Sequence, residues 1–196
     1  MAESWLVRDA TVEDAAACAR IYEPYVRDTV VSFELEPPTA AEVAGRIAAA
    51  LARHAWVVLE DDGRVVGYAY GSTFNARAAY DWSTSVSVYT ETGRRRTGAG
   101  RALYTALFDR LAARGFRTAL AGVVLPNDAS VGLHAAMGFE PVGTFRRVGW
   151  KLGHWHDVAW SQRPLGTGPG EDDDPPAPPG ATVDTAASAG DTRTSN

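Results

Sequence analysis

The spacing of hydrophobic and polar residues predicts a series of short strands and helices. Residues 83–90 alternate polar and apolar side chains, which predicts a strand with one face on a core. Residues 55–60 and 64–72 are apolar, strand-like runs joined by Asp-Asp-Gly, a hairpin signal. Further strands are expected at residues 5–10, 117–124, 140–148 and 156–162, with residues 149–154 connecting the last two.

Helix boundaries are marked by capping residues. Thr11 and Thr39 are each followed three residues later by an acid, the spacing of a capping box. Asn127 is expected to cap a later helix, and Gly115 and Gly138 to end the last two. The resulting order, β-α-α-β-β-β-α-β-α-β-β, defines an α+β fold with a mixed central sheet and helices on both faces.

Composition separates a folded domain from a tail. The chain of 196 residues is 45% hydrophobic, enough for one domain, assigned to residues 1–165. Residues 166–196 are rich in Pro, Gly, Ala and Thr, and we expect them to be disordered. The tail has six acids and one base, a net charge of −5 that equals the −5 of the whole chain. The domain is therefore about neutral, which argues against nucleic-acid binding.

The cysteine content and the apolar runs limit the possible chemistry and location of the protein further. Cys18 is the only cysteine, and its helical, Ala-rich surroundings favour a core residue over a nucleophile. The N-terminus has no apolar signal region, and no apolar stretch reaches membrane-spanning length. A cytoplasmic location without membrane contact is expected.

The strongest chemical signal is a basic, glycine-rich turn at residues 95–100, between the strand 83–90 and a helical run. Glycines allow close backbone approach, and the first N–H groups of a helix are unpaired. The helix dipole and the arginines add positive potential, so the turn predicts a phosphate site. Its spacing fits neither a Walker loop nor a G-x-G-x-x-G fingerprint.

These residues resemble the pyrophosphate loop, Arg/Gln-x-x-Gly-x-Gly, of the GCN5-related N-acetyltransferase (GNAT) superfamily. Residues 127–139 resemble that superfamily's Asn-x-x-Ser-x-x-Leu-(Tyr/His) helix, which ends in Gly-Phe. Three further segments are similar to its phosphinothricin acetyltransferase branch: residues 75–82, 125–128 and 155–158. The resemblance covers residues 5–165. It implies the three-layer α/β/α GNAT fold, acetyl-CoA as co-substrate, and a homodimer.

The resemblance also implies which residues contact acetyl-CoA. The backbone of Val88, Tyr89 and Thr90 is expected to pair with the pantetheine arm. Asn127, which also caps its helix, and Ser130 are expected to touch the arm again. The pyrophosphate is expected to lie against Arg95, Arg96, Thr97, Gly98, Ala99, Gly100 and Arg101.

Three residues are candidates for moving protons. Phosphinothricin-type enzymes have a glutamate at the position matched here by Ser85, and a serine does not ionise near pH 7, so it at most positions a water. Asp81, or His134 through water, is the candidate substitute base. His134 is also suited to relaying a proton to the leaving thiolate; its alternative role is that of a hydrogen-bonded packing residue.

The acceptor is expected to bind beside Arg77 and Tyr80. A guanidinium matches two oxygens of a carboxylate or phosphinate, and a phenol adds a donor. By resemblance, Phe33 and Tyr89 are walls of this pocket; the alternative is a surface arginine and a core tyrosine. No metal is expected, because the two histidines at positions 154 and 156 have no third ligand clustered nearby.

The expected reaction is acetylation of the amine of a small polar amino acid, such as phosphinothricin or methionine sulfone or sulfoximine. One alternative is the same chemistry on another small amine. The other is a catalytically weak acyl-CoA-binding protein, because Ser85 replaces the glutamate. Turnover with a panel of amino acids separates the two classes, since only an enzyme releases CoA.

Overall fold

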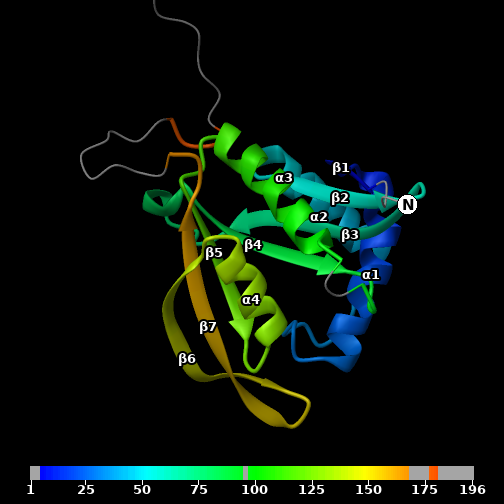
Figure 1. Cartoon of the computed structure of the whole chain (residues 1–196), viewed down its shortest axis with the longest axis vertical. Helices are drawn as coiled ribbons and strands as arrows, with labels where there is room; N and C mark the ends of the chain where they lie inside the picture. Colours follow the sequence, from blue (N-terminus) through cyan, green and yellow to red (C-terminus); the bar gives the residue numbers. More distant parts are fainter. Residues whose placement is uncertain (1–4, 95–96, 168–176, 181–196) are drawn as a thin grey trace, which may run out of the picture.

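The computed structural model describes residues 5–94, 97–167 and 177–180. Arg95, Arg96 and most of the expected tail lie outside these residues. In the described part, a mixed sheet of order β1-β2-β3-β4-β5-β7-β6 lies between two pairs of helices, which confirms the expected fold (Figure 1). Its strands are β1 (Trp5–Asp9), β2 (Trp56–Asp61), β3 (Arg64–Thr73), β4 (Ser83–Thr90), β5 (Thr118–Val124), β6 (Glu140–Lys151) and β7 (His154–Pro164).

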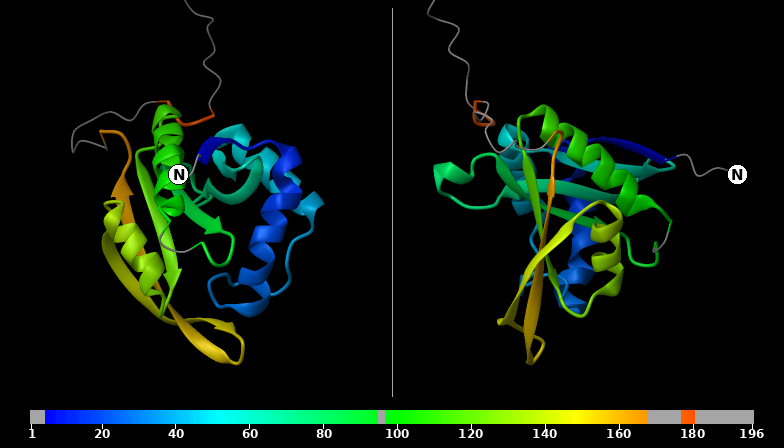
Figure 2. Two further views of the ribbon diagram at one scale, coloured as in Figure 1. Left: turned by 45° about the vertical axis from the view of Figure 1, so that its right-hand side comes forward. Right: turned by 60° about the vertical axis from the view of Figure 1, so that its left-hand side comes forward.

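The helices form two layers, with α1 (Ala15–Asp28) and α2 (Ala40–Arg53) on one face of the sheet, and α3 (Ala99–Ala113) and α4 (Asp128–Ala136) on the other (Figure 2). The capping box that opens α2 is confirmed: Glu42 N donates to Thr39 Oγ1 at 3.2 Å, and Thr39 N donates to Glu42 Oε2 at 2.7 Å. None of the described helices is long and apolar enough to cross a membrane.

The core consists of two clusters, one on each face of the sheet. Leu103, Leu107 and Leu111 of α3 pack on one face, and α1 and α2 pack on the other, where Cys18 is fully buried. Burial raises the pKa of the Cys18 thiol to about 12. Cys18 is therefore an inert core residue, as expected.

The feature that positions the site is a gap in the sheet. β4 and β5 run parallel, but only residues 83–85 pair with residues 118–120. Beyond that point β4 stays with β3 and β5 stays with β7, so the two strands diverge (Figure 1). We call this opening the β4–β5 wedge.

The last hairpin is longer than the sequence predicted. The expected connection over residues 149–154 is wrong, because β6 continues to Lys151 and β7 begins at His154. Leu152 (φ 50°) and Gly153 (φ 79°) make a two-residue turn, and Trp150 pairs with Trp155 across the strands. Residues 140–148 of β6 are exposed on both faces.

The described piece of the tail, residues 177–180, lies against the domain. Pro179 is buried, and it lies close to Gly115 at the end of α3. Gly180 lies beside the Arg53 side chain at the end of α2.

Candidate active site

A cavity of about 50 Å³ occupies the β4–β5 wedge. Its walls come from both diverging strands, from α3 and α4, and from the connection between α1 and α2. The lining residues are Val31, Val86, Ser87, Val88, Tyr89, Tyr104, Gly122, Val123, Val124, Asn127, Ser130 and His134.

The register of β4 decides which backbone groups face the wedge. Tyr89 is paired with Tyr68, and Glu91 N donates to Val66 O at 2.9 Å, so these odd-numbered residues direct their backbone groups towards β3. Val86, Val88 and Thr90 direct theirs towards the wedge. The Tyr89 backbone, which was expected to pair with the pantetheine arm, therefore faces β3, and Val86 is a further residue whose backbone groups face the wedge.

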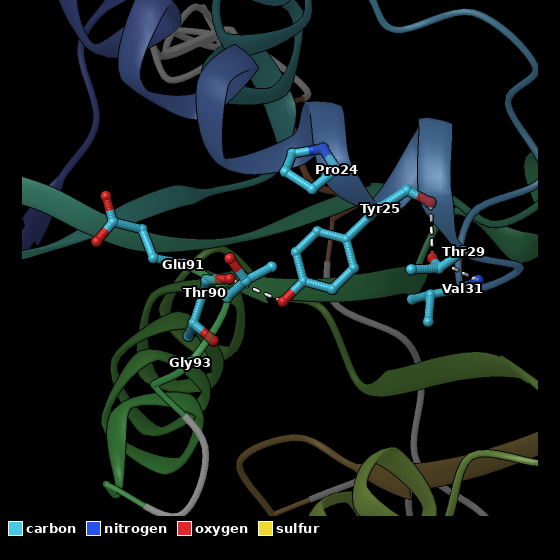
Figure 3. A pocket seen from close by; sticks show the side chains of 8 residues that line it. Pro24, Tyr25, Thr29, Val31, Thr90, Glu91 and Gly93 are labelled. Atoms are coloured by element: carbon cyan, nitrogen blue, oxygen red, sulfur yellow. Dashed lines mark hydrogen bonds between the residues drawn. The ribbon is translucent and has the colours of Figure 1, made fainter.

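The end of β4 is partly closed by α1. Tyr25 Oη donates to Thr90 O at 2.7 Å, beside a second cavity of about 110 Å³ between α1 and the end of β4 (Figure 3). A second hydroxyl group there is also paired, because Thr29 Oγ1 donates to Tyr25 O at 2.7 Å and accepts from Val31 N at 3.1 Å.

The glycine-rich turn forms an anion cradle at the start of α3. Gly98 has φ 92°, a left-handed conformation that favours glycine, and no side chain caps the helix. The first helical bond runs from Ala102 N to Gly98 O, so the N–H groups of Ala99, Gly100 and Arg101 have no acceptor within the helix. The Arg101 side chain has no hydrogen bond or ion pair with a described residue. These groups fit a diphosphate.

The N-cap residue of α4 and a residue of its first turn border the wedge. Asn127 Oδ1 accepts from Ser130 N at 3.2 Å, which confirms the helix cap. Both residues line the wedge. Because the cap uses only the amide oxygen of Asn127, its NH₂ group remains available to a ligand.

His134 is buried and hydrogen-bonded at both ring nitrogens. Nδ1 lies 2.7 Å from Ser130 O, and Nε2 lies 3.0 Å from Tyr104 Oη. A carbonyl oxygen only accepts, so Nδ1 carries the proton and Nε2 accepts from the tyrosine. Burial lowers the pKa of His134 and raises that of Tyr104, which keeps both neutral. They form a hydrogen-bonded pair on the wedge wall. Tyr104 was missed from the sequence.

The other two candidate proton carriers lie apart from this pair. The Ser85 side chain lies on the face of the sheet opposite Thr84 and Val86, which are buried towards α3. Asp81 forms an ion pair with Arg53, at 2.6 Å between Oδ1 and Nη2. A carboxylate held in this way anchors the end of α2 and does not line the wedge.

The expected acceptor residues fall into two groups. Phe33 packs against Gly149 and lies 6.3 Å from His156, measured between ring centroids. The Tyr80 ring packs edge-on against Phe74, and the Phe74 ring packs edge-on against Trp160. Their ring centroids are 5.6 Å and 5.9 Å apart, respectively.

Arg77 and Tyr89 complete the expected set. The Arg77 side chain has no hydrogen bond or ion pair with a described residue, which leaves its guanidinium for an anion. The Tyr89 ring packs edge-on against Tyr22, at 4.8 Å between ring centroids, and Tyr89 is one of the residues that line the wedge. No group of three or more potential metal ligands occurs among the described residues.

A wedge between parallel strands, bordered by backbone donors and a helix N-terminal anion cradle, defines a transferase that uses an acyl-CoA. Residues 7–160 match the model of the acetyltransferase (GNAT) domain, and the chain belongs to this family. The enzyme is an N-acetyltransferase of the branch that resembles phosphinothricin acetyltransferases.

Relatives agree with this assignment. The chain is 40% identical to a phosphinothricin N-acetyltransferase of Streptomyces viridochromogenes, over 88% of this chain and 90% of that one. It is 32% identical to an L-methionine sulfoximine/L-methionine sulfone acetyltransferase of Pseudomonas aeruginosa, over 80% and 92%.

Solved structures show the same fold with the co-substrate bound. A phosphinothricin acetyltransferase from Sinorhizobium meliloti in complex with acetyl-CoA is 36% identical, with a TM-score of 0.84 over 93% of this chain and 97% of that one. A putative acetyltransferase from Salmonella typhimurium with acetyl-CoA is 27% identical, with a TM-score of 0.82 over 89% and 99%.

Proposed function

We propose that the enzyme acetylates the α-amine of a small polar amino acid of the phosphinothricin or methionine sulfone and sulfoximine type. The observation that carries this proposal is the β4–β5 wedge, with its backbone donors and the cradle of α3. Arg77 supports an anionic acceptor, because its guanidinium has no partner among the described residues.

The side chains and backbone groups divide the work. Acetyl-CoA, when bound, supplies the acetyl thioester. The N–H groups of Ala99, Gly100 and Arg101 are assigned to its diphosphate, and the Val86 and Val88 backbone to its pantetheine arm. When an amine displaces CoA, the C–N bond would form as the C–S bond breaks, and the Tyr104 hydroxyl, held by His134 Nε2, is assigned to donate the proton that the leaving thiolate takes. The proton that the amine loses to water would replace it.

No ionised carboxylate occupies position 85, so the acceptor amine must lose its proton by another route. An amine with a pKa near 8 is roughly a tenth deprotonated at pH 7, which allows turnover without a strong base. Ser85 is assigned the positioning of a water that receives this proton.

We also propose a homodimer formed through the β6–β7 hairpin. This hairpin exposes six large apolar side chains although β6 is an edge strand, and exposed apolar side chains in such number are typical of interfaces. Its exposed residues are Val142, Phe145, Val148, Trp150, Leu152 and Trp155, each between 54% and 60% exposed.

A thiol-release assay with acetyl-CoA and a panel of amino acids tests the function. Acceptor-dependent release of CoA, fastest with amino acids that carry a phosphinate, sulfone or sulfoximine group, supports it. Arg77→Met should raise the KM of these amino acid acceptors more than the KM of amines that carry no anionic group. Turnover only with amines that lack a carboxylate would favour the alternative acceptor class, and no release at all would favour an acyl-CoA-binding protein.

A further inference from the structure

The chain contains a single lysine, and that lysine is buried. Of the 19 Lys and Arg residues, only Lys151 is a lysine. It is 4% exposed at the end of β6. A buried ammonium is unfavourable unless its hydrogens are bonded, so the position of Lys151 needs a physical explanation.

Lys151 bridges two segments that are far from it in the sequence. Its Nζ donates to Val26 O and to Ser32 O, each at 2.7 Å. Val26 lies in the last turn of α1, where carbonyl groups lack helical donors and a cation is favoured by the helix dipole. Ser32 lies in the connection between α1 and α2. A compact ammonium can bond to two carbonyls at once, whereas a planar guanidinium is larger and fixed in shape.

The bridged connection carries two residues of the site. Val31 lines the β4–β5 wedge, and Phe33 packs on Gly149, where a Cβ atom would collide with the ring. Between them, Ser32 Oγ is hydrogen-bonded to Tyr22 Oη at 2.6 Å. Residues 31–33 therefore form a wall between the wedge and the β6–β7 hairpin, and Lys151 fixes the middle of this wall.

We propose that Lys151 is a positioning residue for the acceptor: its ammonium holds residues 31–33 in place, so that this wall sets which acceptors fit. This inference rests on the proposed function, because it takes the acceptor to bind on the Phe33 side of the wedge. The reaction itself needs no chemistry from the lysine, which is out of reach beneath the wall.

The variant Lys151→Met tests this assignment, because methionine has a similar length and no donor. The KM of the amino acid acceptor should rise about tenfold or more, as expected for losing hydrogen bonds from a charged group. The preference between small and large acceptors should also weaken. The affinity for acetyl-CoA, measured by calorimetry, should change much less than the acceptor KM, since the cradle at α3 is untouched and only Val31 of the wall lines the wedge.

A second variant acts on the same wall without removing a charge. Gly149→Ala places a methyl group against the Phe33 ring and should raise the acceptor KM in the same way. Gly143→Ala, on the same strand, is the matched control, because a Cβ there meets nothing within 4 Å. Gly143→Ala should leave both the acceptor KM and the acetyl-CoA affinity unchanged.

Three results would overturn the inference. The first is an unchanged acceptor KM and acceptor preference in a folded Lys151→Met. The second is a loss of acetyl-CoA affinity in that variant as large as its rise in acceptor KM. The third is a Gly149→Ala enzyme that behaves like Gly143→Ala, and this result decides the matter if Lys151→Met does not fold. A wild-type enzyme that releases no CoA with any acceptor would instead refute the proposed function, and the role of Lys151 with it.

Discussion

The anion cradle can be tested by two substitutions at one position, Gly98→Ala and Gly98→Asp. Gly98 has φ 92°, so any side chain there is strained by about 1–2 kcal/mol. Among the described residues, a Cβ would meet only the Trp5 ring, at an ordinary contact distance of 3.7 Å, so it clashes with none of them. Both variants should therefore lose similar, modest amounts of stability.

The two variants should differ in their affinity for acetyl-CoA. The aspartate adds a negative charge beside the expected diphosphate. At about 5 Å and an effective dielectric constant of about 20, the repulsion is roughly 3 kcal/mol for each phosphate charge. This corresponds to a loss of affinity of about a hundredfold or more relative to Gly98→Ala.

Calorimetry with acetyl-CoA and thermal melts of both variants separate affinity from stability. The repulsion is partly screened, so the gap between the variants should narrow as salt is raised. If Gly98→Asp bound acetyl-CoA as tightly as Gly98→Ala at low salt, the diphosphate could not lie at the start of α3.

Four further predictions follow from other parts of the molecule. Ser85→Glu should raise turnover on amino acid acceptors by up to about 10²-fold, and most at low pH, where the free amine is scarce. A lower rate from pH 6 to 9 in a folded variant would refute this placement of Ser85. Removal of residues 166–196 should lower the melting temperature only slightly and leave acetyl-CoA affinity unchanged, and a large drop in melting temperature would show that the tail is part of the domain. Phe145→Glu should shift light-scattering mass from dimer to monomer, and a wild-type enzyme that is already monomeric would exclude the β6–β7 interface. Asp14, whose pKa is lowered mainly by its hydrogen bond with Arg8, should stabilise the fold above pH 4. The melting-temperature deficit of Asp14→Asn should therefore shrink as the pH falls through the folded pKa, and a deficit that does not change with pH would contradict this.

Local signals in the sequence predicted most of the secondary structure. The strand at residues 83–90 and the capping box at Thr39 depend on neighbouring residues, and both appear as expected. The hairpin turn at Asp62 and Gly63 is equally local, since both residues adopt positive φ. Such features need no knowledge of distant contacts.

The errors concern contacts between distant residues. The backbone direction of Tyr89 depends on the register with β3, which the sequence does not give. Asp81 looked available as a base because its partner Arg53 is 28 residues away. The length of β6 was underestimated because its exposed residues lack the alternation of a half-buried strand.

Two site residues were missed for different reasons. Tyr104 has an ordinary core position in a helix, and only its hydrogen bond with His134, 30 residues away, reveals it. Lys151 did have a signal, because it is the only lysine in a chain rich in arginine. When a residue type occurs once in a chain, its hydrogen-bond partners are worth determining.

The most direct test of the central claim is the product formed from acetyl-CoA and one acceptor, L-phosphinothricin, followed by mass spectrometry and thiol release together. N-acetylphosphinothricin is expected in a one-to-one ratio with CoA. CoA release at the same rate without the amino acid, or no acetylated product from it or from methionine sulfone and sulfoximine, would show that the enzyme does not acetylate this class of amino acid.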